Sequence, residues 1–181
     1  KDRLIRLNFP MTYDQSKLKR ARTQAALQIQ KKIKAGKKSA FITIGDPMLY
    51  STYIYILEIL NNLVPDFKFK TIPGITSVNA ATAKFNLPLA QNDENIAIIT
   101  ETKNKEELEK IFDVFDNIVI MKLSRNYEKV EKLLDKMELK EKASIISRCG
   151  HEAEFYTENL NKIKTEDIDY LSLMVVKNDY S

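Results

Sequence analysis

The chain reads Phe-Ile-Thr-Ile-Gly-Asp-Pro-Met-Leu-Tyr-Ser-Thr over residues 41–52, and this stretch decides the fold. A short apolar strand leads into a Gly-Asp-Pro turn, and Ser51 or Thr52 then supplies the cap of a helix. Gly45 lets the backbone approach a ligand closely, and Asp46 adds a carboxylate acceptor. Ligands of open α/β sheets lie beyond the carboxyl ends of parallel strands, near the amino ends of the following helices. The stretch therefore predicts either a ligand-binding loop or a plain tight turn.

A second loop of the same kind follows further along the chain. Residues 39–44 and 67–72 are both predicted strands, and Pro73-Gly74 turns the second strand into a helix. Thr76 and Ser77 place hydroxyl groups at the start of that helix. Because neighbouring loops at the ends of parallel strands meet at one edge of a sheet, we expect the two loops to share one crevice.

The chain as a whole is predicted to be an α/β protein of two domains. Residues 1–90 form an incomplete amino-terminal domain with a mostly parallel sheet, in which a basic helix over about residues 14–35 ends at Gly36. Residues 91–181 restart the pattern as a second α/β domain with a mixed sheet. Its predicted elements lie at residues 95–100, 104–114, 117–121, 126–138, 143–147 and 171–176, with a hairpin-like segment near 155–160.

Composition narrows the class of protein. With 181 residues and 44% hydrophobic side chains, the chain is long and apolar enough to bury a core. It has no run of about 18 apolar residues and no secretory signal at its start, so we expect a cytoplasmic protein. The single cysteine, Cys149, excludes an internal disulfide, and the single histidine, His151, excludes a multi-histidine zinc site. No metal site is therefore expected.

Positive charge is concentrated near the start of the chain. Residues 1–45 hold 12 lysines and arginines against Asp2 and Asp14, a net charge of +10, whereas the remaining residues carry −6. Most of these cations lie on the predicted helix over residues 14–35, which is a solvated amphipathic helix, a phosphate-binding surface or an attractor for a polyanionic small molecule. Aromatic residues do not interleave with the cations, which argues against binding of single-stranded nucleic acid.

Four segments follow one another in an ordered set along the chain. They are Gly45-Asp46-Pro47-x-x-Tyr50-Ser51-Thr52, Ile72-Pro73-Gly74-Ile75-Thr76-Ser77, Asn86-Leu87-Pro88-Leu89 and Val119-Ile120-Met121-Lys122. This ordered set resembles the tetrapyrrole methylase family of S-adenosylmethionine-dependent methyltransferases, and the similarity runs along essentially the whole chain. Phe9-Pro10-Met11-Thr12 and Met121-Lys122-x-x-Arg125-Asn126 are most similar to members that methylate precorrin-2 in cobalamin (vitamin B12) biosynthesis.

The resemblance implies two α/β domains with S-adenosylmethionine bound between them, and methyl transfer to C20 of precorrin-2 or cobalt-precorrin-2. It also implies a homodimer with a tetrapyrrole substrate and no nucleic-acid or membrane partner. The cofactor contacts that it implies are Ile44, Gly45, Asp46, Leu49, Thr76, Ser77, Met121, Gly150 and Ser172. The candidate substrate contacts are Tyr50, Lys122, Arg125 and His151. No catalytic residue is assigned, because an activated sulfonium donor needs an aligned carbon nucleophile more than a strong base.

The residues leave several of these roles open. Tyr50 packs on the substrate or holds its own loop, Met121 belongs to the core or contacts the cofactor, and His151 contacts the substrate or completes a turn. Surface ion pairing is the alternative role for the cations Lys122, Arg125 and Arg148.

The family's usual opening, a glycine-rich Gly-x-Gly-Pro-Gly-Asp-Pro segment after a first strand, would precede Lys1. We therefore expect the 181-residue chain to transfer methyl groups poorly or not at all. Two further hypotheses stay open. One is another methylase of the family, acting at a different corrin position, on diphthine or on ribosomal RNA. The other is a non-catalytic RNA-binding module that uses the basic block.

Overall fold

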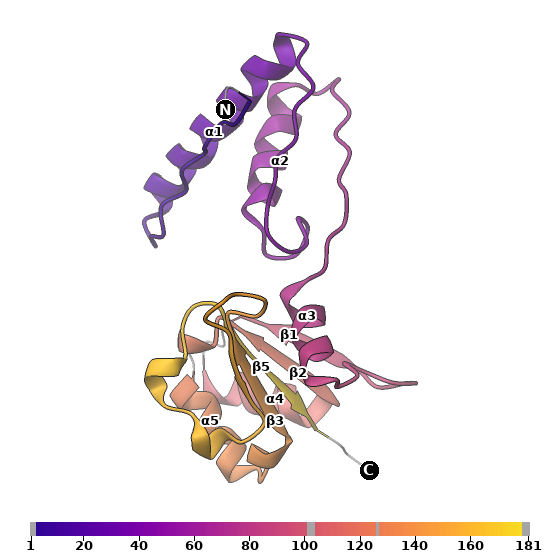
Figure 1. Ribbon diagram of the computed structural model, residues 1–181, viewed down its shortest axis with the longest axis vertical. Helices are drawn as coiled ribbons and strands as arrows, with labels where there is room; N and C mark the ends of the chain where they lie inside the picture. The colour runs from indigo at the N-terminus through magenta and orange to yellow at the C-terminus, as the bar shows by residue number, and fades with distance from the viewer. Residues whose placement is uncertain (1–2, 101–103, 126, 179–181) are drawn as a thin grey trace. The chain divides into compact units, whose positions relative to one another are not determined.

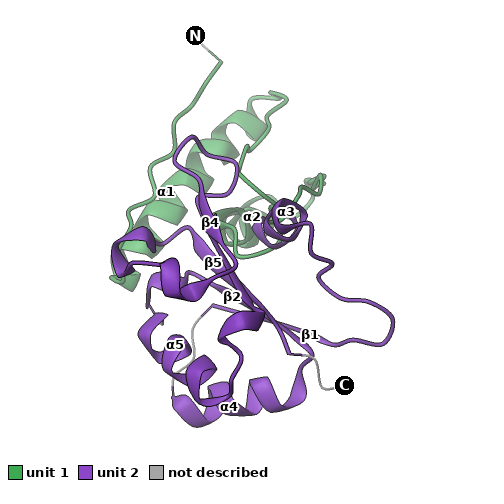
Figure 2. Cartoon of the chain, turned by 60° about the horizontal axis from the view of Figure 1, so that its bottom comes forward, with its two compact units in different colours: residues 1–76 green, residues 77–181 purple. Residues whose placement is uncertain are grey.

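The computed structural model describes residues 3–100, 104–125 and 127–178 (Figure 1). The chain forms two compact units, Lys1–Thr76 and Ser77–Ser181, which Figure 2 colours separately. They are called unit 1 and unit 2 below. No helix in the described part of the chain is long and apolar enough to cross a membrane.

Unit 1 is built on a pair of helices, α1 (Gln15–Lys34) and α2 (Thr52–Leu63). The Asp14 side chain caps α1 by accepting from the backbone N–H groups of Ser16 and Lys17 at 3.0 and 3.1 Å. Gly36, at φ 68°, follows the end of this helix, as the sequence predicts. The core between the helices contains Ala25, Ala26, Ile56 and Leu60, with Leu7, Phe9, Phe41 and Phe69 packed against it.

The predicted strands of unit 1 do not form a sheet. Residues 39–44 and 67–72 carry no strand assignment, and no residue described between 3 and 76 belongs to a strand. Both segments nevertheless alternate as strands do: Phe41 and Phe69 pack on the helices, whereas Ile42, Ile44 and Ile72 are 84%, 100% and 72% exposed. A strand requires a hydrogen-bonded neighbour, and these segments do not pair with one another. The mostly parallel sheet expected in this half is therefore absent from the described residues.

Unit 2 contains a mixed five-stranded sheet in the order β1-β2-β5-β3-β4, which confirms the mixed sheet expected there. Its strands are β1 (Ile96–Ile99), β2 (Asn117–Met121), β3 (Ala143–Ser147), β4 (Phe155–Thr157) and β5 (Ser172–Lys177). β1 and β2 are parallel, whereas β5 runs antiparallel to both β2 and β3. Strands β1, β2 and β3 therefore point the same way, and their carboxyl ends lie at one edge of the sheet.

Helices cover both faces of this sheet. On one face α4 (Lys105–Val114) and α5 (Tyr127–Lys136) bury Ile118 and Ile120 of β2. On the other face α3 (Ser77–Phe85) packs over Val119. Because alternate residues of β2 enter different cores, the strand is apolar throughout, as is typical of a strand buried on two sides. Short 3₁₀ turns at Leu123–Arg125, Lys140–Lys142, Leu160–Lys162 and Thr165–Asp167 complete the connections.

The compact units divide at an earlier residue than the domain boundary expected near Ala90. The division falls between Thr76 and Ser77 because α3 packs on the sheet of unit 2 through Val78, Ala81 and Phe85. The boundary near Ala90 stays a prediction about the domains, and the description below follows the compact units.

Candidate functional site

Two loops of unit 1 are joined by the carboxylate of Asp46. Its Oδ2 accepts a hydrogen bond from the backbone N–H of Gly74 at 2.9 Å, and its Oδ1 accepts one from Met48 at 2.7 Å. The Gly45-Asp46-Pro47 turn and the Pro73-Gly74 turn are therefore neighbours, as the sequence predicts for two adjoining loops. These hydrogen bonds, that from Gly74 first, lower the pKa of Asp46 below its ordinary value of 3.8. The Asp46 carboxylate therefore holds the two loops together, and its contact with the cofactor stays a prediction.

The contact between the loops requires glycine at one position. A Cβ added to Gly74 would lie 2.4 Å from the carbonyl oxygen of Gly45, far inside van der Waals contact. Gly45 itself has φ +76°, and a Cβ there would meet only the Ile75 carbonyl oxygen, at 3.7 Å. Gly74 therefore serves the close approach of two backbones, whereas Gly45 supplies a left-handed turn where a Cβ would make only an ordinary van der Waals contact.

The other predicted residues of unit 1 lie around these loops. Ile44 is fully exposed, Leu49 is half-buried, and Tyr50 has φ 52° with about half of its surface exposed. Thr76 is half-buried at the end of unit 1, and Ser77 is the exposed first residue of α3 in unit 2. The predicted helix cap is Ser51, whose hydroxyl accepts from the N–H of Tyr53 at 3.2 Å.

We expect Asp46→Ala to separate the two loops and to weaken binding of S-adenosylhomocysteine roughly tenfold, the size expected for lost charge-assisted hydrogen bonds. Folding lowers the pKa of Asp46, so the hydrogen bonds that its carboxylate accepts are intact above the ordinary value of 3.8 and are lost as the pH falls through the lowered pKa. Calorimetric titration at pH 7, where these hydrogen bonds are intact in the wild type, measures the affinity. Asp66→Ala, in the loop after α2, is the control. An Asp46→Ala affinity equal to that of the control would contradict the expectation.

In unit 2 the predicted residues gather at the edge where β2 and β3 end. Met121 closes β2 and pairs in register with Leu173, while Ser147 closes β3 and pairs with Ser172. Gly150 lies in the loop after β3 with φ +78°, and a Cβ there would meet no atom within 4 Å. The backbone of this loop is therefore open to an approaching group.

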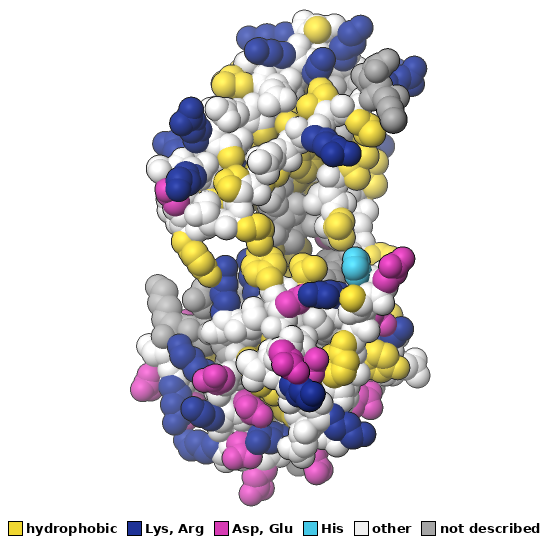
Figure 3. Space-filling model, turned by 60° about the vertical axis from the view of Figure 1, so that its left-hand side comes forward, with side chains coloured by type: hydrophobic (Ala, Val, Ile, Leu, Met, Phe, Trp, Pro, Cys, Tyr) yellow, Lys and Arg dark blue, Asp and Glu magenta, His cyan; other side chains and the backbone are white. Residues whose placement is uncertain are grey.

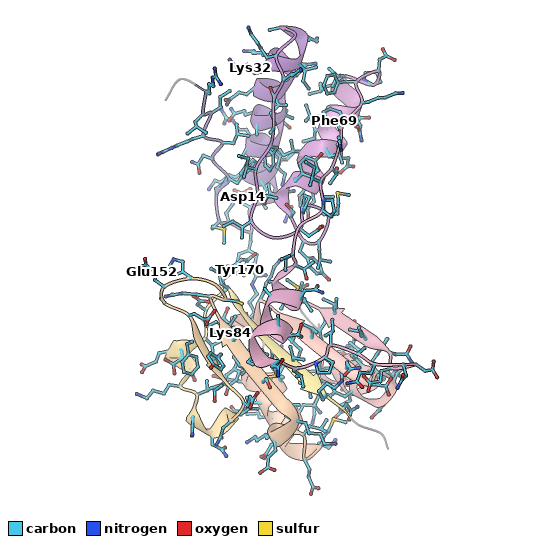
Figure 4. The ribbon with its side chains drawn as sticks, turned by 45° about the vertical axis from the view of Figure 1, so that its right-hand side comes forward. Asp14, Lys32, Phe69, Lys84, Glu152 and Tyr170 are labelled. Carbon is cyan, nitrogen blue, oxygen red and sulfur yellow. The ribbon has the colours of Figure 1, made fainter. Side chains whose placement is uncertain are left out.

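A carboxylate also holds this second glycine loop. Glu154 Oε2 accepts from the backbone N–H of Gly150 at 2.7 Å, and Glu154 Oε1 forms an ion pair with Lys84 Nζ of α3, also at 2.7 Å. The hydrogen bond from Gly150 and then the one from Lys84 lower the pKa of Glu154. Figure 4 labels Lys84 on the helix that carries it. Sequence reasoning missed this pair, because nothing local in the sequence connects residues so far apart.

His151 completes the same turn. Its backbone N–H donates to the Arg148 carbonyl at 2.9 Å, and its ring Nδ1 accepts from the N–H of Ala153 at 3.2 Å. The structure thus gives His151 a turn-forming role, and a contact with substrate stays a prediction.

Ser172 is buried and Met121 is half-buried at this edge of the sheet. Ser172 is 1% exposed, and its hydroxyl donates to Ser147 Oγ at 2.9 Å. Met121 is half-buried and packs with Cys149 in the apolar layer under α3. The Ser172 hydroxyl is therefore held within the sheet edge, and the cofactor contacts of Ser172 and Met121 stay predictions. Asn126 of the sequence motif lies outside the described residues.

Unit 1 has a glycine loop before the amino end of a helix, and unit 2 has one at the edge of a helix-covered sheet. Such loops are typical of α/β proteins that bind small molecules. The sequence matches the family of tetrapyrrole (corrin/porphyrin) methylases over residues 1–163, and the chain belongs to that family.

Known members show how far the likeness extends. The chain is 34% identical to a probable cobalt-precorrin-2 C(20)-methyltransferase of Methanocaldococcus jannaschii, with 94% of this chain and 71% of the relative covered. It is 28% identical to the cobalt-precorrin-2 C(20)-methyltransferase of Salmonella typhimurium, with 96% and 72% covered. Its fold resembles the uroporphyrin-III C-methyltransferase of Thermus thermophilus in complex with S-adenosylhomocysteine, at a TM-score of 0.54 and 14% identity over 84% of this chain and 71% of that one.

Proposed function

We propose that the activity of this chain is S-adenosylmethionine-dependent methyl transfer to C20 of precorrin-2 or cobalt-precorrin-2 in cobalamin biosynthesis, and poor transfer by these 181 residues stays a prediction. The observation that carries the proposal is the 34% identity to a relative of that name over 94% of the chain. A cytoplasmic location and a homodimer accompany the proposal as predictions.

The loops of the two units suit the cofactor. Gly45 and Gly150 present left-handed backbone with space where a side chain would lie, so a ligand can approach their peptide groups. Leu49 in unit 1 and Met121 in unit 2 are each half-buried and apolar, and each stays a predicted contact of the cofactor. S-adenosylmethionine supplies an activated methyl group when it is bound, so the task of these residues is to orient reactants and exclude water.

The substrate accounts for the uneven charge. Precorrin-2 carries several carboxylates, and cations attract and orient such a polyanion. Figure 3 shows dark-blue side chains spread over the visible face of unit 1 with few magenta ones among them, in keeping with the +10 net charge of residues 1–45. This agrees with the hypothesis of an attractor for a small polyanion.

Calorimetric titration with S-adenosylhomocysteine tests the proposal. We expect saturable binding by the folded chain and no comparable heat with ATP, which shares the adenosine but lacks the amino-acid part. Absence of S-adenosylhomocysteine binding by a chain that circular dichroism shows to be folded would overturn the proposal. Salt-sensitive binding of RNA in its place would support the RNA-binding module instead.

A further inference from the structure

Ion pairs hold the loop between β3 and β4 at both of its ends. The loop covers residues 148–154, from the end of β3 to the start of β4, and is called the 148–154 loop below. Its first residue, Arg148, donates through Nε to Asp169 Oδ2 at 2.5 Å. Its last residue, Glu154, lies with Oε1 at 2.7 Å from Lys84 Nζ of α3. Gly150 is thus exposed between two fixed points.

Lys84 is anchored better than most lysines at a protein surface. It belongs to the last turn of α3, and its neighbour Phe85 is buried in the core that α3 shares with the sheet. Its Nζ also lies 5.3 Å from the ring centroid of Tyr156 in β4. The Glu154 side chain is only 17% exposed, so water screens this ion pair less than it screens a fully exposed one.

Glu154 fixes the direction of one peptide group. The carbonyl of Cys149 and the N–H of Gly150 belong to the same planar, trans peptide bond, so they point in opposite directions. Because Glu154 Oε2 accepts from this N–H at 2.7 Å, the Cys149 carbonyl oxygen is directed away from Glu154. Glycine adopts positive and negative φ with similar ease, so without Glu154 this peptide group could rotate.

Other amides of the 148–154 loop are also turned inward. The N–H of His151 donates to the Arg148 carbonyl at 2.9 Å, and the N–H of Ala153 donates to the His151 ring at 3.2 Å. Within the part of the chain that the structure describes, no residue donates to the carbonyl oxygen of Cys149 or of Gly150. These oxygens are the groups that the loop offers to a ligand, and they accept from amino or hydroxyl groups.

We propose that Glu154, itself held by Lys84, is a positioning residue for the cofactor. It locks the peptide between Cys149 and Gly150 in the orientation that presents the Cys149 carbonyl oxygen to amino or hydroxyl groups of S-adenosylmethionine. The inference rests on the proposed function, in which the Gly150 backbone is approached by the cofactor. Glu154 and Lys84 act through the loop and not by contact with the cofactor. A loop that is ordered before binding raises affinity, because binding does not have to order it.

Calorimetric titration of the full chain with S-adenosylhomocysteine tests this role. Glu154→Ala frees the peptide and is expected to weaken binding about tenfold, and Lys84→Met about threefold. Glu154→Gln is expected to recover most of the loss, because its amide oxygen still accepts from the N–H of Gly150. Lys84→Met added to Glu154→Ala is expected to change the affinity no further, since Lys84 acts through Glu154.

Glu109→Ala is the matched control. Glu109 of α4 also pairs with a lysine of another helix, Lys136 of α5, at 2.9 Å, but these helices cover the opposite face of the sheet from α3. We expect this variant to lower the melting midpoint without changing the affinity for S-adenosylhomocysteine. A loss of affinity as large as that of Glu154→Ala would overturn the positioning role.

Hydrogen exchange of the Gly150 amide, followed by NMR without cofactor, measures the lock itself. Glu154→Ala is expected to speed this exchange about tenfold, and Glu109→Ala to leave it unchanged. An unchanged rate in Glu154→Ala, or wild-type affinity in both Glu154→Ala and Lys84→Met, would overturn the positioning role. Either result with intact S-adenosylhomocysteine binding by the wild type would leave the proposed function standing. A folded wild type that binds no S-adenosylhomocysteine would overturn both.

Discussion

Gly74→Ala is expected to lower the affinity for S-adenosylhomocysteine by about tenfold to a hundredfold, which corresponds to 1–3 kcal/mol of overpacking strain. The new Cβ would lie 2.4 Å from the Gly45 carbonyl oxygen, and the obstacle is backbone, which cannot rotate aside as a side chain would. The loops must separate, and the hydrogen bond from Gly74 to Asp46 lengthens with them. Calorimetric titration measures the affinity, and circular dichroism measures the melting midpoint.

Gly36→Ala is the matched control for this change. Gly36 has φ +68°, and a Cβ there would meet nothing within 4 Å, so alanine strains the backbone without a clash. We expect Gly36→Ala to lower the melting midpoint while it leaves the affinity for S-adenosylhomocysteine unchanged. The assignment of the two loops to the cofactor would fail if Gly74→Ala kept wild-type affinity, or if the control lost as much affinity as Gly74→Ala.

Local sequence patterns were sufficient to predict the strands of unit 2 and the helices of both units. The predicted bounds of β2 and β3 agree with the structure, because each strand is a largely apolar run with a charged residue on either side. Asp14 and Gly36 mark the ends of α1 through side-chain capping and left-handed backbone, both of which are properties of single residues.

Pairing between distant segments was not predictable in the same way. The period of two over residues 39–44 indicates an extended backbone, and the structure keeps that alternation. Whether such a segment joins a sheet depends on a neighbour that the segment itself does not encode. The prediction of a sheet in unit 1 was wrong for this reason, whereas the prediction of an extended, alternating backbone over these residues was right.

The candidate site shows the same division between local and distant information. The glycine loops were visible in the sequence, and the structure brings the Gly45 and Gly74 loops together as expected. The hydrogen bonds by which Asp46 and Glu154 hold these loops were not predictable from the sequence, and the contact of Asp46 with the cofactor stays a prediction. Their partners lie in other loops or helices, so only the fold reveals that they position backbone.

Asp169→Ala is expected to lower the free energy of unfolding of unit 2 by about 2–3 kcal/mol, the range for a broken and partly buried hydrogen-bond network. Asp169 Oδ1 accepts from Ser147 Oγ at 3.2 Å and lies 3.3 Å from Ser172 Oγ, which donates to Ser147, and both serines are buried. Its other oxygen faces Arg148, where the carboxylate is 29% exposed, so water replaces part of that contact. Thermal unfolding followed by circular dichroism measures the loss, which should amount to several degrees.

Asp135→Ala is the control, because Asp135 pairs with Lys140 through a side chain that is 69% exposed, and such pairs contribute about 0–1 kcal/mol.

The pH dependence of stability separates the two variants further. Burial raises the pKa of Asp169, but the hydrogen bonds from Arg148, Leu171 and Ser147 outweigh it and hold the pKa below 3.8. A carboxylate with a lowered pKa stabilises the fold above its ordinary value, and this stabilisation is lost as the pH falls through the lowered pKa. The difference in melting midpoint between wild type and Asp169→Ala should therefore be full at pH 7 and shrink below pH 3.8. A difference that stays constant through this range would show that the loss comes from packing and not from the ionised carboxylate.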